Sequence, residues 1–249
     1  MVLHAPGDLR LEEVQVPSPG GNELLLRVET VGICGTDASE YRHGAKLFPL
    51  ERRHPVTGHL GPMIPGHEFS GRVVAVGAGV EGFTTGELVV SAGSTACGSC
   101  HMCRSKRPSR CDRYWAVGLQ RDGALAEYCT APANACLGVE AAGLTPDTAA
   151  LAQPMSIAVH ALRRARIEGG EEVVVIGAGG IGAFVTYAAA RAGCSVVTVD
   201  LDRDRLAVAA GLGAGTTICV GSDATAGLAA GVVLEISGTE AGLRTALSM

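Results

Sequence analysis

Four cysteines, spaced as C-x2-C-x2-C-x7-C, carry the clearest chemical signal in this chain: Cys97, Cys100, Cys103 and Cys111. Thiolates that surround one tetrahedral zinc ion at about 2.3 Å must be delivered by tight turns. Gly98, Ser99 and the polar stretch 104–110 can form such turns. The spacing therefore predicts a structural zinc site.

Two alternatives for these four thiols stay open, a disulfide knot and an iron–sulfur cluster. Similar cysteine spacings serve zinc and iron–sulfur clusters. A disulfide knot needs an oxidising compartment, and the amino terminus MVLHAPGDLRLEEV lacks the basic start and apolar core of a cleavable signal peptide. We therefore expect a reducing, cytoplasmic location and favour zinc.

A second chemical signal is the glycine-rich turn GAGGIG, in which Gly177, Gly179 and Gly182 hold a G-x-G-x-x-G pattern. The turn follows the apolar stretch EEVVVI and precedes an alanine-rich helical pattern, which is the context that a dinucleotide requires. The first glycine allows the tight turn, the second lets the backbone approach a pyrophosphate, and the third lets helix and strand pack closely. The helix amino terminus adds free N–H groups. We predict a dinucleotide-binding turn made by Gly177, Gly179, Gly180, Ile181 and Gly182.

Asp200 ends the next predicted strand, about 20 residues after the glycine turn, where dinucleotide-binding folds place an acidic residue. Its carboxylate can accept hydrogen bonds from both ribose hydroxyls and would repel a 2′-phosphate, so NAD is favoured over NADP. Arg205 is a further candidate contact to the cofactor. Arg203 keeps NADP open, because a guanidinium can pair with a 2′-phosphate. The alternative is a glycine turn with an unrelated surface aspartate.

A third signal combines Cys34, in VGICGTD, with His67, in PGHEFSG. Each is ambiguous alone, because a single buried cysteine is often a small hydrophobic residue and a single histidine is often packed. Their meaning depends on the elements around them.

The sequence pattern differs between the two halves of the chain. Residues 3–151 are cut by proline and glycine into short strand-like pieces such as ELLLRVET, GRVVAVGAGV and ELVVSAG, which predict a β-rich, barrel-like domain. From residue 171, strands alternate with helices, which predicts a parallel sheet with strands at 171–176, 195–200, 216–220 and 231–236. We expect a boundary helix over 147–166 and domains at 1–150 and 151–249.

Composition limits the classes of partner. The 249 residues suit two domains, and 35 glycines indicate many tight turns. No apolar run approaches the ~20 residues needed to cross a bilayer, and a net charge of −5 gives no basic field for nucleic acid. We therefore expect neither membrane nor nucleic-acid partners.

Taken in order, CGTD, GHE, the four-cysteine run, GAGGIG and Asp200 make the chain resemble the zinc-dependent medium-chain dehydrogenase/reductase superfamily over essentially its whole length. The stretches GDLRLEEV and HPVTGHLGPMIPGHEFSG are most similar to the butanediol and polyol branch, which includes sorbitol and threonine dehydrogenases. The resemblance implies an α/β fold, with a GroES-like β-rich catalytic domain followed by a Rossmann doubly wound parallel sheet.

The resemblance also implies roles for single residues. Cys34 and His67 match ligands of a catalytic zinc, and Glu68 matches a carboxylate on or just behind the metal. Thr36 matches the hydroxyl that takes the alcohol proton, with an N-terminal helix cap as the alternative. Gln153 stands where the polyol branch has a glutamate ligand; an amide is a poorer ligand for zinc, and Gln153 could instead cap or pack its helix.

The proton relay departs from the family pattern. Ser39 stands where the family often has a histidine, so water or His43 would have to continue the relay from Thr36.

These implications lead to an NAD-dependent zinc alcohol dehydrogenase, with one catalytic and one structural zinc, that acts on a small secondary alcohol, vicinal diol or polyol. Gln153 favours a second reading, an aldose dehydrogenase. The sheet of this fold normally has six strands and family members continue for roughly another third of this length. We therefore expect an incomplete Rossmann sheet in a truncated chain, which would be a homo-oligomer at full length. A non-catalytic zinc- and nucleotide-binding remnant is the third reading.

Overall fold

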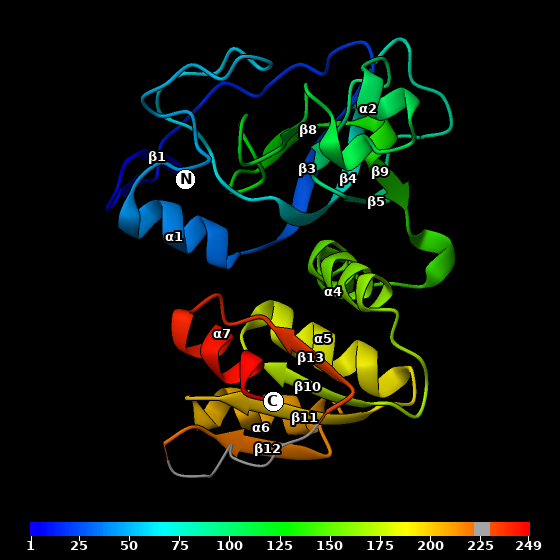
Figure 1. Ribbon diagram of the computed structural model, residues 1–249. Coiled ribbons are helices and arrows are strands. Elements are labelled where there is room, and N and C mark those ends of the chain that lie inside the picture. Colours follow the sequence, from blue (N-terminus) through cyan, green and yellow to red (C-terminus); the bar gives the residue numbers. More distant parts are fainter. Residues whose placement is uncertain (222–229) are drawn as a thin grey trace. The chain divides into compact units, whose positions relative to one another are not determined.

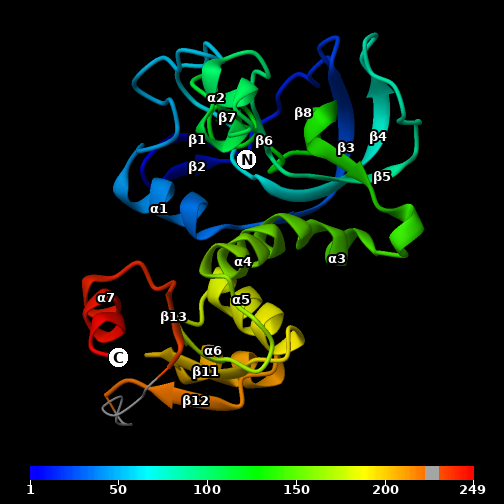
Figure 2. The ribbon, with the colours of Figure 1, turned by 45° about the vertical axis from the view of Figure 1, so that its right-hand side comes forward.

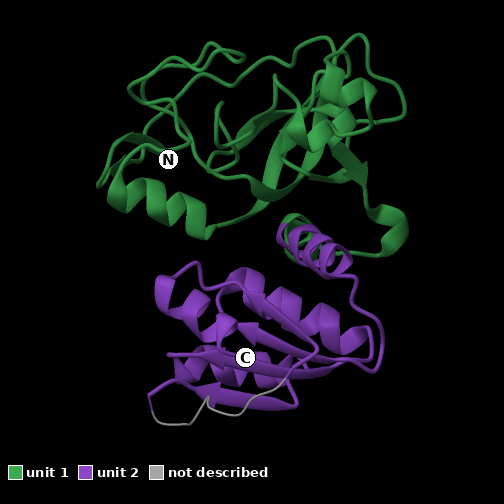
Figure 3. Ribbon diagram, viewed as in Figure 1, with its two compact units in different colours: residues 1–153 green, residues 154–249 purple. Residues whose placement is uncertain are grey.

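The computed structural model describes residues 1–221 and 230–249, and the chain divides into two compact units (Figure 3). The first unit covers residues 1–153 and the second covers residues 154–249. The division lies close to the domain boundary expected between residues 150 and 151. Each unit has its own main sheet and its own buried apolar clusters.

The first unit is built on a five-stranded antiparallel sheet (Figure 1). Its strands, in spatial order, are β8 (Tyr128–Pro132), β3 (Glu23–Gly32), β4 (Glu68–Val76), β5 (Leu88–Ser91) and β9 (Cys136–Gly138). Alternating apolar residues of β3, such as Leu24 and Leu26, pack with Phe69, Val73 and Val89 in one buried cluster. The strands predicted from ELLLRVET, GRVVAVGAGV and ELVVSAG are confirmed.

Shorter elements surround this sheet. The helix α1 spans Gly35–His43, and the remaining short pieces are β1 (Val2–Ala5), β2 (Asp8–Arg10), β6 (Ser94–Thr95), β7 (Trp115–Ala116), α2 (His101–Arg104) and the 3-10 turns Pro108–Arg110, Ala133–Ala135 and Glu140–Ala142.

The predicted helix over 147–166 is two helices, α3 (Pro146–Ala150) and α4 (Ala152–Ala165). The break has a simple cause at Pro154. Proline has no N–H with which to bond the carbonyl of Ala150, whereas it is tolerated in the first turn of a new helix, where N–H groups have no intrahelical partner. The chain therefore ends one helix at Ala150 and starts the next at Ala152.

The second unit contains a parallel sheet in the order β12 (Thr216–Cys219), β11 (Ser195–Asp200), β10 (Glu172–Ile176) and β13 (Val232–Glu235). The helices α4 and α5 (Gly180–Arg191) pack on one face through Val173 and Val175, and α7 (Glu240–Leu247) packs on the other through Val174 and Ile176. Figure 2 shows α7 apart from α5 and α6 (Arg203–Gly211). All four predicted strands are confirmed, as is the α/β class.

The strand order of this sheet defines where a ligand belongs. The chain moves outward from β10 to β12 and then returns to the opposite side of β10 as β13, so the order reverses between β10 and β13. Ligands of open α/β sheets bind outside the carboxyl ends of the strands at such a point. The glycine turn at residues 177–182 begins directly at this position.

Within residues 1–221 and 230–249, no helix combines the length and the apolar character that crossing a membrane requires.

Candidate metal and dinucleotide sites

The pairing of β3 with β4 brings the first candidate site together. The register ends with Gly32 opposite Glu68, so Cys34 lies just beyond the end of β3 and His67 lies just before β4. Ligand atoms of Cys34, His67 and Glu68 consequently lie within 4.8 Å of one another. Sulfur, imidazole nitrogen and carboxylate oxygen are the donors that zinc accepts in catalytic sites.

Gly32 makes space for the carboxylate. A Cβ atom added at Gly32 would lie only 3.0 Å from the Glu68 Oε2 atom. Glu68 is itself buried, so its carboxylate needs a cationic or hydrogen-bonding partner.

Asp37 is a member of this site to which we assigned no role from the sequence. Its Oδ2 accepts the Cys34 N–H at 2.9 Å, and its Oδ1 lies 3.5 Å from His67 Nδ1. Asp37 Oδ1 and His67 Nδ1 are both buried, and neither has a hydrogen-bond partner among the described residues. A carboxylate behind a metal-binding histidine fixes the ring orientation. The only sequence signal was the position of Asp37 within CGTD.

The site favours positive charge. Burial alone would lower the pKa of His67, but the Asp37 carboxylate and the Cys34 sulfur outweigh burial and raise it to about 10. The same surroundings that stabilise a proton on the imidazole would stabilise a metal cation, which competes with that proton. The donor set and its field therefore fit a zinc ion.

Thr36 lies inside the first turn of α1, and the N-cap of that helix is Cys34. The alternative of Thr36 as the helix cap is therefore wrong. Thr36 is half-buried. His43 is two helical turns further on, about 10 Å along the axis, so a direct proton transfer between the two is too long.

Gln153 lies in the first turn of α4 and is half-buried. Its role at the metal stays a prediction.

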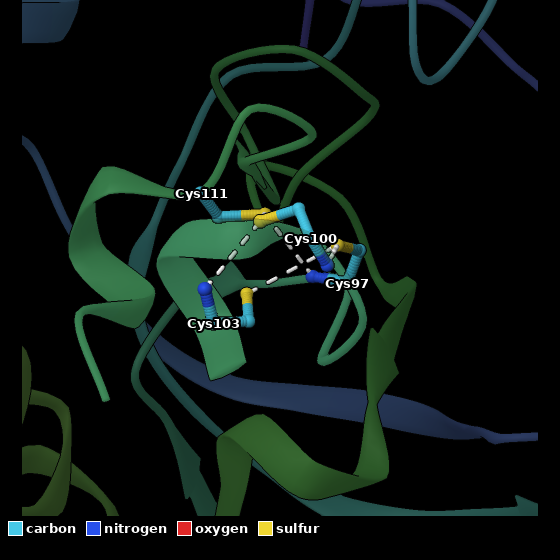
Figure 4. A group of neighbouring side chains, drawn as sticks. All are labelled: Cys97, Cys100, Cys103 and Cys111. Atoms are coloured by element: carbon cyan, nitrogen blue, oxygen red, sulfur yellow. Dashed lines mark hydrogen bonds between the residues drawn. The ribbon is translucent and has the colours of Figure 1, made fainter. Parts of the chain in front are cut away.

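The four cysteines of the lobe 97–111 form the second candidate metal site, and Figure 4 shows their side chains turned toward one another. The sulfur atoms of Cys97 and Cys103 are 4.0 Å apart, and those of Cys100 and Cys111 are 3.9 Å apart. Two sulfurs bound to one tetrahedral zinc at about 2.3 Å would be about 3.8 Å apart. The spacing fits a single metal ion. All four are free cysteines, so the disulfide alternative is wrong.

Backbone N–H groups stabilise the lobe thiolates. Cys97 Sγ accepts the Cys100 N–H at 3.3 Å, and Cys111 Sγ accepts the N–H groups of Cys97 and Arg113, each at 3.3 Å. The Ser99 hydroxyl and the backbone N–H groups of Ser99 and Cys100 lower the pKa of Cys97 to about 6. Burial and the neighbouring thiols raise the pKa of Cys103 to about 12. Cys97 therefore loses its proton more readily than an ordinary thiol, and Cys103 less readily; a bound metal ion would favour the thiolate form of both.

A first prediction concerns this lobe. We expect Cys100→Ser to remove one metal ion per chain and to lower the free energy of unfolding, because metal binding at a structural site contributes directly to folding. Metal analysis and urea unfolding of purified protein test this. Cys194→Ser, at a half-buried cysteine outside both candidate sites, is the matched control. Unchanged metal content in Cys100→Ser would contradict the assignment.

The glycine turn has the geometry expected of its first and third glycines. Gly177 has φ +100°, and a Cβ there would lie 2.7 Å from the Ser237 nitrogen. A Cβ at Gly182 would overlap the Gly177 carbonyl oxygen. Gly179 is the N-cap of α5 and has no atom within 4 Å of an added Cβ, so the space beside it is open. Binding of a dinucleotide by Gly177, Gly179, Gly180, Ile181 and Gly182 stays a prediction.

Asp200 lies directly against this turn. Its Oδ2 accepts the Ala178 N–H at 2.6 Å, and its Oδ1 accepts the Asp202 N–H at 2.9 Å. Each carboxylate oxygen keeps a second lone pair for a ligand hydroxyl. Arg205 lies in the first turn of α6, where its Nε is 3.6 Å from Asp202 Oδ2. Contact of either residue with a cofactor stays a prediction.

Comparison with known proteins gives consistent matches. Residues 20–141 match the family model of the alcohol dehydrogenase GroES-like domain. The chain is 36% identical over 252 residues to erythritol/L-threitol dehydrogenase of Mycolicibacterium smegmatis, covering 96% of this chain and 69% of that protein. The crystal structure of 2R,3R-butanediol dehydrogenase from Bacillus subtilis superimposes with a TM-score of 0.88 at 29% identity, covering 99% of this chain and 72% of the other.

A further matching structure was solved with a bound nucleotide. A putative zinc-binding dehydrogenase from Sinorhizobium meliloti, bound to NADP, matches with a TM-score of 0.77 at 29% identity and covers 88% of this chain and 60% of its own. Across the first curated relatives, this chain spans between 55% and 71% of the relative's length.

Proposed function

Because this chain belongs to the zinc-type medium-chain alcohol dehydrogenase family, we propose that it carries out zinc-dependent, NAD-linked oxidation of a small secondary alcohol, vicinal diol or polyol. The observation that supports this most is the convergence of Cys34, His67 and Glu68 at the shared end of β3 and β4. A second support is the glycine turn, where Asp200 accepts the Ala178 N–H and open space lies beside Gly179; we assign the nicotinamide dinucleotide to this turn.

Each residue has a defined task in this proposal. Zinc, when bound, supplies a Lewis acid that makes an alcohol easier to deprotonate. Cys34, His67 and Glu68 hold the metal, with Gln153 as a further ligand, and Asp37 orients the His67 imidazole. The Thr36 hydroxyl, in the first turn of α1, would accept the alcohol proton while it donates its own proton to water. The lobe 97–111 holds a second, structural zinc.

Gln153 supports a second candidate, an aldose dehydrogenase, since aldose dehydrogenases of this superfamily are similar in carrying glutamine there. Turnover on butane-2,3-diol and on glucose, each with NAD, separates the two. Two zinc ions per chain with preference for the diol support the first candidate. Preference for glucose supports the second, and one zinc without turnover supports a non-catalytic remnant.

A prediction on cofactor choice follows from Asp200. We expect Asp200→Ala to weaken NAD binding by roughly 10- to 100-fold, because a hydrogen bond to a charged group contributes about 1.5–3 kcal/mol. NADP binding should weaken less or improve, because the repulsion of a 2′-phosphate is removed. Fluorescence titration with both nucleotides measures this, with Asp204→Ala, on the exposed start of α6, as control. An equal loss for both nucleotides would indicate that Asp200 only supports the glycine turn.

A further inference from the structure

We infer that residues 118–125 (GLQRDGAL) act as a clamp that positions His67 for metal binding. This inference rests on the proposed catalytic zinc. It adds that the position of one ligand, His67, is set by a segment that contributes no ligand itself. The clamp segment, defined as residues 118–125, follows β7 and precedes β8. It lies against residues 64–66, directly before His67.

Four hydrogen bonds join the clamp to those three residues. The N–H groups of Gly123, Leu125 and Ala124 donate to the carbonyls of Ile64, Pro65 and Gly66 at 2.7, 2.9 and 2.9 Å, respectively. In the opposite direction, the Ile64 N–H donates to Asp122 Oδ1 at 2.8 Å. Every residue of the stretch 64–66 is therefore bonded to the clamp.

Glycines let the two backbones approach more closely than any other residue would allow. A Cβ at Gly118 or at Gly123 would overlap the Gly66 carbonyl oxygen. Gly66 has φ +100°, and a Cβ there would lie 2.8 Å from the Leu125 nitrogen. The Gly66–His67 peptide is consequently held by direct backbone contact, with no side chain between the two segments.

A fixed peptide matters because the His67 ring has little freedom to compensate. The side chain is buried, with Nδ1 turned to Asp37 and with Cys34 and Glu68 in ligand range. Metal ligands must be held to within about 0.5 Å, and loss of a supporting contact typically reduces metal affinity by about 10- to 100-fold. The four lobe cysteines have no hydrogen bond to the clamp among the described residues, so they serve as an internal reference.

Asp122 offers the sharper test because it is exposed and its replacement should leave the chain folded. Asp122→Ala removes the acceptor for the Ile64 N–H, whereas Asp122→Asn keeps an amide oxygen in the same place. We measure Co²⁺ binding by thiolate-to-cobalt absorption together with urea unfolding. We expect the parent to bind two Co²⁺ ions per chain. Asp122→Ala should bind the ion outside the lobe 97–111 at least about 10-fold more weakly, and Asp122→Asn should bind it about as tightly as the parent.

Gly123→Ala, paired with Gly21→Ala, tests the close approach. An added methyl meets no atom within 4 Å at Gly21 but overlaps Gly66 at Gly123, and neither glycine has a positive φ. We expect Gly123→Ala, but not Gly21→Ala, to weaken binding of the Co²⁺ ion that lies outside the lobe 97–111. If Gly123→Ala does not fold, the comparison of Asp122→Ala with Asp122→Asn tests the clamp. Parent-like binding in folded Asp122→Ala overturns the clamp alone. A parent that binds only the lobe ion overturns the catalytic zinc and the clamp together.

Discussion

Cys34→Ser is expected to lose one of two metal ions per chain and to lower NAD-linked alcohol turnover by at least about 10³-fold. The estimate follows from the several kcal/mol that a Lewis-acidic metal contributes to the transition state, at about 1.4 kcal/mol for each factor of ten. Serine is a good N-cap residue, so the start of α1, which Cys34 caps, should be preserved. The defect should therefore appear in metal content and turnover without unfolding.

Metal analysis, steady-state kinetics and urea unfolding on the same preparation check this. Cys194→Ser controls for the chemistry of a cysteine-to-serine change, because Cys194 is a half-buried cysteine that belongs to neither cluster of metal-ligating side chains found among the described residues. If Cys34→Ser kept both metal ions and full turnover, Cys34 would not be a ligand and the proposed reaction centre would be wrong.

Local patterns predicted much of this fold. Apolar runs bounded by glycine and proline identified β3, β4 and β5, and the alternation of strands and helices identified the parallel sheet. These signals work because strand burial and turn chemistry are encoded within a few neighbouring residues. The zinc lobe was equally accessible, since all four thiols lie within 15 residues of one another.

Features that depend on tertiary contacts could not be predicted from local sequence patterns. The contact of Asp37 with His67 joins α1 to the residue just before β4, and it forms because β3 pairs with β4 as far as Gly32 and Glu68. That pairing includes two register shifts in β3 and β4, which no sequence pattern revealed. The break at Leu151 could have been predicted, because Pro154 cannot donate a hydrogen bond to Ala150.

The dinucleotide turn gives the second large prediction, in which substitutions at three glycines distinguish an effect on stability from an effect on nucleotide binding. Gly182→Ala is expected to reduce the free energy of unfolding by about 3 kcal/mol or more and to abolish nucleotide binding. The cause is the overlap of its methyl group with the Gly177 carbonyl oxygen, a backbone atom that cannot move without opening the turn. Circular dichroism in urea and titration with NAD measure the two effects.

Gly179→Ala should behave differently, because the added methyl meets no protein atom and the residue has φ −66°, which alanine adopts readily. Its free energy of unfolding should stay within about 1 kcal/mol of the parent. Nucleotide binding should nevertheless fall by roughly 100-fold, since the methyl group fills the space reserved for a pyrophosphate.

Gly211→Ala is the matched control for both variants, because Gly211 is a helical glycine of α6 with open space around it. It should be slightly stabilising, by about 0.4–1 kcal/mol, with unchanged nucleotide binding. If Gly179→Ala bound NAD as tightly as Gly211→Ala does, the open space beside Gly179 would not face the phosphates. The turn would then act only in packing α5 against β10, and the dinucleotide would have to bind elsewhere on the sheet.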